Sequence, residues 1–394
     1  MTNLKRCTVL LSTLIMVFVL LAPALVAQGR TLAAGGPGAA AQRKALKAAY
    51  AKEAAKLGLP AIQPRPVVPI NQITQVNTAK YKKPAPYTIA FASQGPTNSW
   101  ARIYDYVFKY RLDSKYKRMV KNYYYTDAGG NAGKQVSDIN DLLVRRPDIL
   151  VVTPLGAAVK GPVERAARMG IPVVFCADAA PTNKFISLVN RDNYLNGALE
   201  AEWLVQQLHG KGAIIAESGI AGVDTAIQRY NGAMSVFSKH PSIHILSHVY
   251  ADWSPTKGKE VTDAVLAAHP KIDGVWSDSG LQMAGAIQSF VSAHRTIPPM
   301  TGEPFNGFLR LAKQYHVKFL AVDFPPIQSA VCADTAIRIL QGKPVSNYVN
   351  VPALTVTSKN LGKYYNSSYT DDMWSDLLGF MPKSQLAKLG LVKG

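Results

Sequence analysis

The chain contains few cysteines and few charged residues. Three cysteines in 394 residues are too few for a disulfide scaffold or a cysteine-rich zinc protein. Only 18% of the residues are charged, whereas 48% are hydrophobic, and intrinsically disordered chains show the opposite balance. The composition therefore predicts a folded globular protein, long enough for roughly two or three domains.

Long apolar runs are absent except near the N-terminus. There, Lys5 and Arg6 precede a mostly apolar stretch, residues 9–21, and small residues follow it up to Ala24 and Ala27. A basic start, a short apolar stretch and small residues at its end are typical of a secretory signal peptide. A retained membrane helix is the alternative, but the run is only marginally long enough. We expect residues 1–27 to be removed, with cleavage after Ala24 or Ala27, and the mature protein to lie in the periplasm.

Acidic residues are scarce relative to basic ones. The chain has 44 Lys and Arg against 25 Asp and Glu, a net charge of +19, which can indicate nucleic acid or an acidic membrane as a partner. Residues 28–84 hold ten of the basic residues and one acid, Glu53, which gives 10 − 1 = +9. The basic residues of this extension do not alternate with aromatics, so we expect no nucleic-acid partner. Residues 40–57 favour a basic helix, and the rest of the extension resembles a proline-rich linker.

Catalytic and metal-binding motifs are also missing. The run Gly129–Lys134 looks like a phosphate-binding loop, but Ala128 stands where its first glycine belongs and Gln135 where Ser or Thr should be. No dinucleotide fingerprint and no Gly-x-Ser-x-Gly elbow occurs. His244 and His248 would be ~13 Å apart on a strand, too far for one metal ion. We therefore expect no enzyme activity, no cofactor and no metal.

Two of the cysteines allow two interpretations. Cys176 and Cys332 can form a disulfide in an oxidising compartment, or they can be two small buried hydrophobic residues. The sequence leaves both open.

From residue 86, short apolar segments alternate with amphipathic stretches of helical length, which predicts βαβ units around parallel sheets. The first series has expected strands at 87–92, 120–125, 149–153, 172–176 and 185–189. The second has them at 213–216, 244–250, 274–277, near 300, and at 317–322. The fold class is therefore α/β, with two Rossmann-like lobes. Ligands bind at the carboxyl ends of such strands, so we expect a cleft between the lobes.

Motifs scattered over both series carry a family resemblance. They are Asn98-Ser99-Trp100, Asp127, Lys134-Gln135, Pro147-Asp148, Ala167, Gly170-Ile171-Pro172, Asp192-Asn193, Gly197, Arg229, Gly232 and Gly342. With these motifs in this order, residues 86–358 resemble a periplasmic sugar-binding protein of the type I class, close in pattern to ribose-binding proteins. Such proteins are the extracytoplasmic receptors of ABC importers.

The resemblance implies a domain organisation and a function. It implies an N-terminal lobe of residues 85–189 and 324–345, a C-terminal lobe of 190–323 and 346–358, and hinge crossings near Val189, Asp323 and Val345. A tail, residues 359–394, lies outside the family pattern. The implied function is hinge closure around a sugar or similar small polar ligand, and delivery by a monomer to an inner-membrane permease.

The alternative function is a ligand-sensing receptor of the same fold that feeds chemotaxis or signalling. A transcription repressor of this fold needs a DNA-binding helix-turn-helix before the first lobe, where this chain has a signal peptide and a linker.

The resemblance also implies the ligand contacts, and the chemistry of a sugar explains their types. Hydroxyls need side chains that donate and accept hydrogen bonds, and the apolar faces of a sugar ring need aromatic side chains. The expected contacts are Gln94, Asn98, Trp100, Asp178, Trp253, Asp278, Ser279, Glu303 and Asp323. The alternatives are that the tryptophans belong to the core and that Asp278 and Glu303 are solvated loop carboxylates.

The chain departs from the family pattern at the arginines. The usual Asp-Arg pair is replaced by Ala177 and Asp178, and the usual contact arginine by Ile227. Arg229 aligns with a position that serves structure in the family, so it is not among the expected contacts. The loss of both arginines disfavours ribose and favours another sugar, a polyol, an amino sugar or a different polar ligand.

Overall fold

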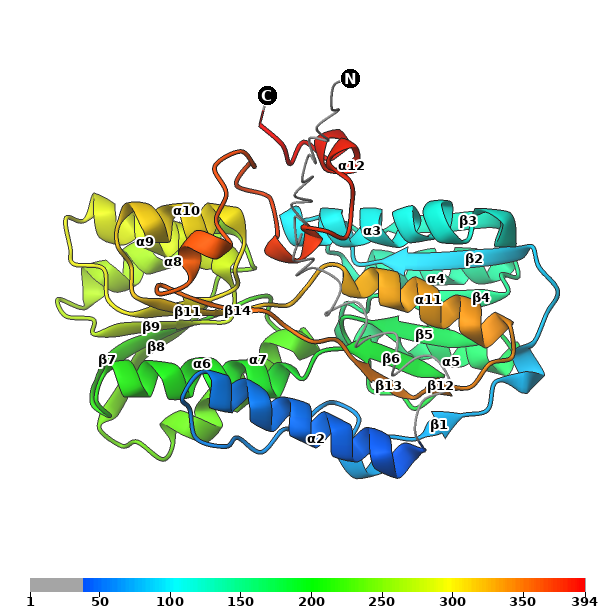
Figure 1. Ribbon diagram of the computed structural model, residues 1–394, viewed down its shortest axis with the longest axis horizontal. Helices are drawn as coiled ribbons and strands as arrows, with labels where there is room; N and C mark the ends of the chain where they lie inside the picture. The colour runs from blue at the N-terminus through cyan, green and yellow to red at the C-terminus, as the bar shows by residue number, and fades with distance from the viewer. Residues whose placement is uncertain (1–37, 394) are drawn as a thin grey trace, which may run out of the picture.

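The computed structural model describes residues 38–393 and shows two α/β lobes that lie side by side (Figure 1). The sheet of the N-terminal lobe has the strand order β13-β6-β5-β4-β2-β3, and all its pairings are parallel. Its strands are β2 Tyr87–Ser93, β3 Val120–Asp127, β4 Ile149–Val152, β5 Val173–Cys176, β6 Ser187–Asn190 and β13 Tyr348–Asn350. β4 and β5 consist of aliphatic, aromatic and cysteine residues that are all buried, as expected of strands covered on both faces.

The sheet of the C-terminal lobe has the order β14-β11-β10-β9-β7-β8. Its strands are β7 Gly212–Ser218, β8 Ile243–Tyr250, β9 Gly274–Ser277, β10 Met300–Gly302, β11 Phe319–Val322 and β14 Thr355–Thr357. Only β14 runs antiparallel to its neighbour. The predicted α/β class with two mostly parallel sheets is confirmed.

Helices cover both sheets. Those of the N-terminal lobe are α3 Ser99–Lys115, α4 Ala132–Val144, α5 Lys160–Arg168 and α11 Gln328–Leu340. Those of the C-terminal lobe are α6 Asn193–Gln207, α7 Asp224–Phe237, α8 Pro255–Ala268, α9 Gly280–Ser292 and α10 Asn306–Gln314. Several begin at a side-chain cap just after a strand: Asn98 accepts from the Ala101 amide, and Ser279 from the Leu281 amide. Such caps fix the helix starts at the strand ends, where the lobes face each other.

The third crossing between the lobes lies later in the chain than the sequence predicts. We expect it near Val345, with residues from 346 onward in the C-terminal lobe. Instead, Val345–Ser346 (β12) pairs with Gln75–Val76 (β1) of the N-terminal extension, and β13 then pairs with β6 of the N-terminal lobe. The chain therefore crosses between β13 and β14.

The extension, as far as it is described, is not a free linker. Its helix α2 (Ala39–Lys56) lies along both lobes (Figure 1) and buries Leu46, Tyr50 and Ala54. The Tyr50 hydroxyl donates to Asn350 Oδ1 at 3.0 Å, and Glu53 forms a two-pronged ion pair with Arg191 at 3.1 and 2.7 Å. The extension therefore covers the first and third crossings. The predicted signal peptide, residues 1–27, lies outside the described residues.

A disulfide joins β5 to α11. Cys176 and Cys332 are bonded and both side chains are fully buried. Of the two possibilities that the sequence leaves open, a disulfide or two free buried cysteines, the structure has the disulfide. The bond anchors the loop that begins at Ala177. As for membranes, no helix between residues 38 and 393 combines the length and the apolar character that a bilayer span needs.

Candidate functional site

A cavity lies between the lobes, at the carboxyl ends of their strands. It encloses about 430 Å³, its opening to solvent included. Both lobes and the second crossing line it, through Gln94, Asn98, Trp100, Thr153, Ala177, Asp178, Thr225, Arg229, Trp253, Ser279, Leu281, Glu303 and Phe324. Seven of the nine contacts expected from the sequence are among these residues. The structure thus brings together side chains up to 230 positions apart in the chain, from Gln94 to Phe324.

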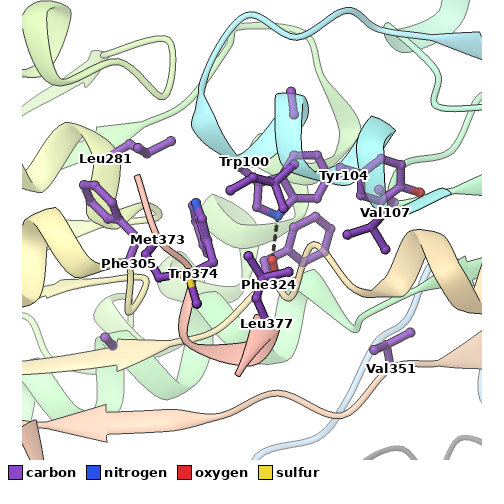
Figure 2. Packing of buried hydrophobic residues seen from close by; sticks show 14 of the residues in the cluster. Trp100, Tyr104, Val107, Leu281, Phe305, Phe324, Val351, Met373, Trp374 and Leu377 are labelled. Carbon is purple, nitrogen blue, oxygen red and sulfur yellow. Dashed lines mark hydrogen bonds between the residues drawn. The ribbon is translucent and has the colours of Figure 1, made fainter. Parts of the chain in front are cut away.

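Trp100 forms the aromatic wall of the N-terminal lobe. Its ring stacks on Tyr104 at 4.7 Å and on Phe324 at 5.4 Å, and its indole Nε1 donates to the Phe324 carbonyl at 2.6 Å (Figure 2). The side chain is 8% exposed. Trp100 therefore belongs to the core and lines the cavity at once, and its bonds hold its ring in one orientation.

Asn98 precedes Trp100 and has its two amide atoms in different roles. Its Oδ1 caps α3 by accepting from the Ala101 amide at 2.9 Å. This leaves the Nδ2 group as the donor available for a ligand hydroxyl. Gln94, on the loop after β2, lines the same side of the cavity.

Trp253 forms the facing aromatic wall, in the C-terminal lobe. Asp252 and Trp253 both have left-handed backbone conformations, with φ of 53° and 49°, which are unusual for bulky residues. The turn lays the indole directly over Gly219, where a Cβ would lie 1.9 Å from the ring. Only glycine fits at position 219, and the indole Nε1 is fixed by donating to Asp278 Oδ1 at 3.1 Å.

Glu303 is the central carboxylate of the C-terminal wall. Its Oε2 accepts from the Ser279 hydroxyl at 2.8 Å, and its Oε1 lies 3.0 Å from Arg229 Nη1. Burial raises the pKa of Glu303 to about 7, and the attraction of Arg229 opposes the rise. Near neutral pH this group can therefore exist both as an acceptor-only carboxylate and as a carboxylic acid that donates.

Arg229 lines the cavity, although it is not among the contacts expected from the sequence. Its Nε donates to Asn193 Oδ1 at 3.1 Å and its Nη1 to the Asp278 carbonyl at 2.5 Å. The guanidinium lies 4.7 Å from the centre of the Phe324 ring, within the range of a cation–π contact. Its Nη2 is buried and has no hydrogen-bond partner in residues 38–393, so a donor remains for a ligand.

Two glycines allow Arg229 to reach the cavity. A Cβ at Gly197 of α6 would lie 1.8 Å from the Arg229 carbonyl, and one at Gly232 would lie 2.0 Å from the Tyr194 carbonyl. The two helices therefore cross with their backbones in contact, which brings α7 close enough for its arginine to reach the cavity. Both glycines are among the motifs of the sequence that carry the family resemblance.

Asp178 contributes a carboxylate from the N-terminal lobe. It follows Ala177, whose φ is 63°, and its Oδ1 accepts from the Ala179 amide at 2.8 Å. Burial, and then the nearby Asp224, raise the pKa of Asp178 well above its usual range. Across the cleft, the Thr225 hydroxyl donates to the Ala177 carbonyl at 3.4 Å. The lobes are therefore closed on each other at this point.

Asp278 and Asp323, two of the expected contacts, are not in the lining. The Asp278 carboxylate is occupied by the Gly219 amide and the Trp253 and Gln282 side chains, each at 3.1 Å. It positions Trp253 instead of facing the cavity. Asp323 is 1% exposed on the second crossing, and the next residue, Phe324, takes its place in the wall.

The remaining lining residues follow strand ends or begin helices. Thr153 comes directly after β4, and Thr225 and Leu281 lie in the first turns of α7 and α9. In the part of the chain that the structure covers, no group of three or more His, Cys, Asp or Glu side chains is arranged to hold a metal ion.

The amino-acid sequence is similar to those of known binding proteins. A family model described as a periplasmic binding protein domain matches residues 89–344. The ribose import binding protein of Bacillus subtilis (strain 168) is 28% identical over 235 residues, 59% of this chain and 76% of that protein. A xylitol-binding protein of Mycolicibacterium smegmatis is 29% identical over 180 residues, 45% of this chain and 52% of that protein.

The fold has close counterparts as well. An ABC transporter solute-binding protein from Mycobacterium smegmatis, solved with bound glycerol, superimposes with a TM-score of 0.65 at 25% identity, over 72% of this chain and 98% of that one. The family model covers more than half of the chain, and the two lobes and their cleft agree with it. The chain belongs to the periplasmic binding protein family.

Proposed function

We propose that this protein is the extracytoplasmic solute-binding protein of an ABC importer, and that it binds a sugar or polyol between its lobes. The observation that carries the proposal is the composition of the cavity wall. Three aromatic rings, those of Trp100, Trp253 and Phe324, stand among amide, hydroxyl, carboxylate and guanidinium groups. Aromatic faces suit the apolar faces of a sugar ring, and the polar groups suit its hydroxyls.

The relatives support a binding role. Members of the family are binding proteins rather than enzymes, and the named relatives are a ribose and a xylitol binder. We further propose that the protein acts as a monomer and that a permease of the inner membrane receives the ligand from the closed form. Closure and opening would take place about the three crossings.

The ligand we propose is not ribose itself. Positions 177 and 178 carry alanine and aspartate instead of the family's Asp-Arg pair, and Ile227 is 44% exposed. The guanidinium of the cavity comes from Arg229 instead, and it is engaged by Glu303. A different placement of donors selects a different pattern of hydroxyls, because a buried polar group without its partner costs ~1–3 kcal/mol.

A thermal-shift screen with pentoses, hexoses, polyols and amino sugars tests this function. A ligand that binds only the folded state raises the unfolding temperature. We expect at least one sugar or polyol to do so and calorimetry to give one site. A panel without any hit, on protein stripped of ligand by unfolding and refolding, would contradict the proposal.

Variants of two wall residues test the site. We expect Glu303→Gln and Trp253→Ala each to weaken binding of the screened ligand by about tenfold or more, ~1.4 kcal/mol. The first variant loses a charge-assisted hydrogen bond, and the second loses a stacking face. Calorimetry measures both.

The control for these variants is His244→Ala, an exposed position at the start of β8, away from the strand ends. It should bind as the wild type does. Wild-type affinity in both wall variants would place the ligand elsewhere.

We also propose that the protein is exported and cleaved. Lys5, Arg6 and the apolar stretch behind them form the signal. The intact mass of protein from a periplasmic extract is expected to correspond to a chain that begins at Leu25 or Gln28. An intact Met1 on that material would show that the segment is retained.

A further inference from the structure

The C-terminal segment 366–391, here called the strap, contacts both lobes. Its first part holds the C-terminal lobe. Asn306 Nδ2 donates to the carbonyls of Asn366, Tyr369 and Thr370, each at 3.1 Å. Arg310 holds Asp371 with two parallel hydrogen bonds of 2.9 and 2.7 Å.

The second part of the strap contacts α3 of the N-terminal lobe. Arg102 binds the Asp372 carboxylate at 3.0 Å and the Leu389 carbonyl at 2.8 Å. One turn further along α3, the Tyr106 hydroxyl donates to Gln385, on the short helix α12 (Lys383–Lys388). Figure 1 shows the strap passing between the lobes, with α12 above α3.

The middle of the strap packs between the lobes, beside the cavity. Trp374 is fully buried, pairs with Phe305 through a backbone bridge, and donates from its indole to the Ser99 hydroxyl at 3.3 Å. Figure 2 shows Trp374 and Leu377 among Phe305 of one lobe, Trp100 of the other and Phe324 of the second crossing. Asp376 accepts from the Ile327 amide on that same crossing, at 3.0 Å. The strap is therefore hydrogen-bonded to the hinge.

The strap also lines a groove next to the cavity. A groove of about 670 Å³, its open space included, lies beside the cavity and shares Asn98 and Leu281 with it. Asp371 and Asp372 of the strap form part of the groove wall, together with Ser254 of the C-terminal lobe. An opening of the lobes that separates α3 from α10 cannot leave both halves of the strap in place.

We propose that the strap is a latch that holds the lobes closed even without ligand, and that its α12 end leaves α3 when the cleft opens. The two ends differ in the kind of bond they make. At the C-terminal lobe, two backbone bonds, from the Asn306 amide to the Met373 carbonyl and from the Gly307 amide to the Asp371 carbonyl, add to the side-chain bonds of Asn306 and Arg310. The α3 end depends on side chains, and its ion pair is 37% and 53% exposed, where solvent screens it.

The latch predicts a closed ligand-free protein. Spin labels at Lys160→Cys and Ala221→Cys, two exposed positions in opposite lobes, report the gap. They flank Gly156 and Gly222, which approach each other across the cleft. Both native cysteines of the described chain are bonded. In protein stripped of ligand, pulsed electron paramagnetic resonance is expected to give one short distance between the two spin labels.

Loss of the α3 contacts should release the latch. In Arg102→Ala/Tyr106→Phe we expect a second, longer distance in the ligand-free sample. The matched control is Arg111→Ala, on the same helix, because Arg111 binds Asp334 of α11 within the N-terminal lobe. The control should keep the short distance.

Two results would overturn the latch: a ligand-free wild type as open as the double variant, or a double variant as closed as the control. Circular dichroism establishes that each variant is folded. If the double variant does not fold, Gln385→Ala removes one strap contact from outside α3 and is judged by the same distances.

Discussion

Glu217→Gln is expected to stabilise the protein by roughly 3 to 5 kcal/mol at pH 8.5 and to leave its stability near pH 4 unchanged. Glu217 lies on β7 and is fully buried. Its Oε1 accepts from the Thr262 hydroxyl at 2.6 Å, and its Oε2 has no partner in the described chain. Burial raises the pKa of Glu217 from 4.5 to about 8.

The sign of the effect follows from the proton count. Between pH 4.5 and 8 the unfolded chain has lost the Glu217 proton while the folded chain keeps it. The free energy of unfolding contributed by this group therefore falls as pH rises through that window, and it is constant above and below it. Glutamine has the same shape and no charge, so the variant loses this dependence.

Urea unfolding at several pH values measures the effect. The matched control is Glu260→Gln, the same change at a side chain that is 65% exposed, and it should alter stability by no more than about 0.5 kcal/mol. If wild type and Glu217→Gln kept the same stability difference from pH 5 to 8.5, the buried carboxyl would not be protonated in the folded state.

Arg229→Met is expected to reduce stability by about 3 kcal/mol or more and to weaken ligand binding by over tenfold. Methionine fills much of the same space but removes the Arg229 donors from Glu303 Oε1, Asn193 Oδ1 and the Asp278 carbonyl. The pKa of Glu303 should rise above 7, because the opposing attraction is gone. The binding loss follows from the removal of the unpartnered Nη2 donor.

Calorimetry with the screened ligand and urea unfolding separate the two effects. Arg295→Met is the control, because Arg295 donates to three carbonyls at the end of α8 and stacks on Phe290, away from the cavity. The control should lose stability but keep its affinity. Unchanged affinity in Arg229→Met would remove Arg229 from the site.

The sequence predicts the strands of the sheets well because their residues form short, continuous apolar runs that are buried on both faces. β4, β5 and β9 are short, apolar and bounded by turns, and they lie where the apolar runs predict them. Cavity residues such as Asn98 and Ser279 were also predictable, since each caps a helix just after a strand. A residue that follows a strand and caps the next helix can be recognised from its immediate sequence neighbours.

Other features depend on contacts that no local pattern reports. Asp323 is buried, whereas its neighbour Phe324 faces the cavity. The direction of the chain at the second crossing determines which of these two side chains lines the cavity. In the tail, Leu377 is buried and its neighbour Leu378 is 41% exposed, without a period that would separate them. The sequence predicts a basic helix over residues 40–57, but not that this helix buries Leu46, Tyr50 and Ala54 against the lobes.

The burial of α2 bears on the order in which the molecule assembles. Tyr50 bonds to a residue 300 positions later, and Gln42 to one 304 positions later. The first helix of the described chain has no complete binding surface until β12 and β13 have formed. Contacts this far apart in sequence slow folding, because chain closure precedes any gain in packing. A nascent chain without its last fifty residues would carry α2 undocked, with the apolar face of that helix exposed to water.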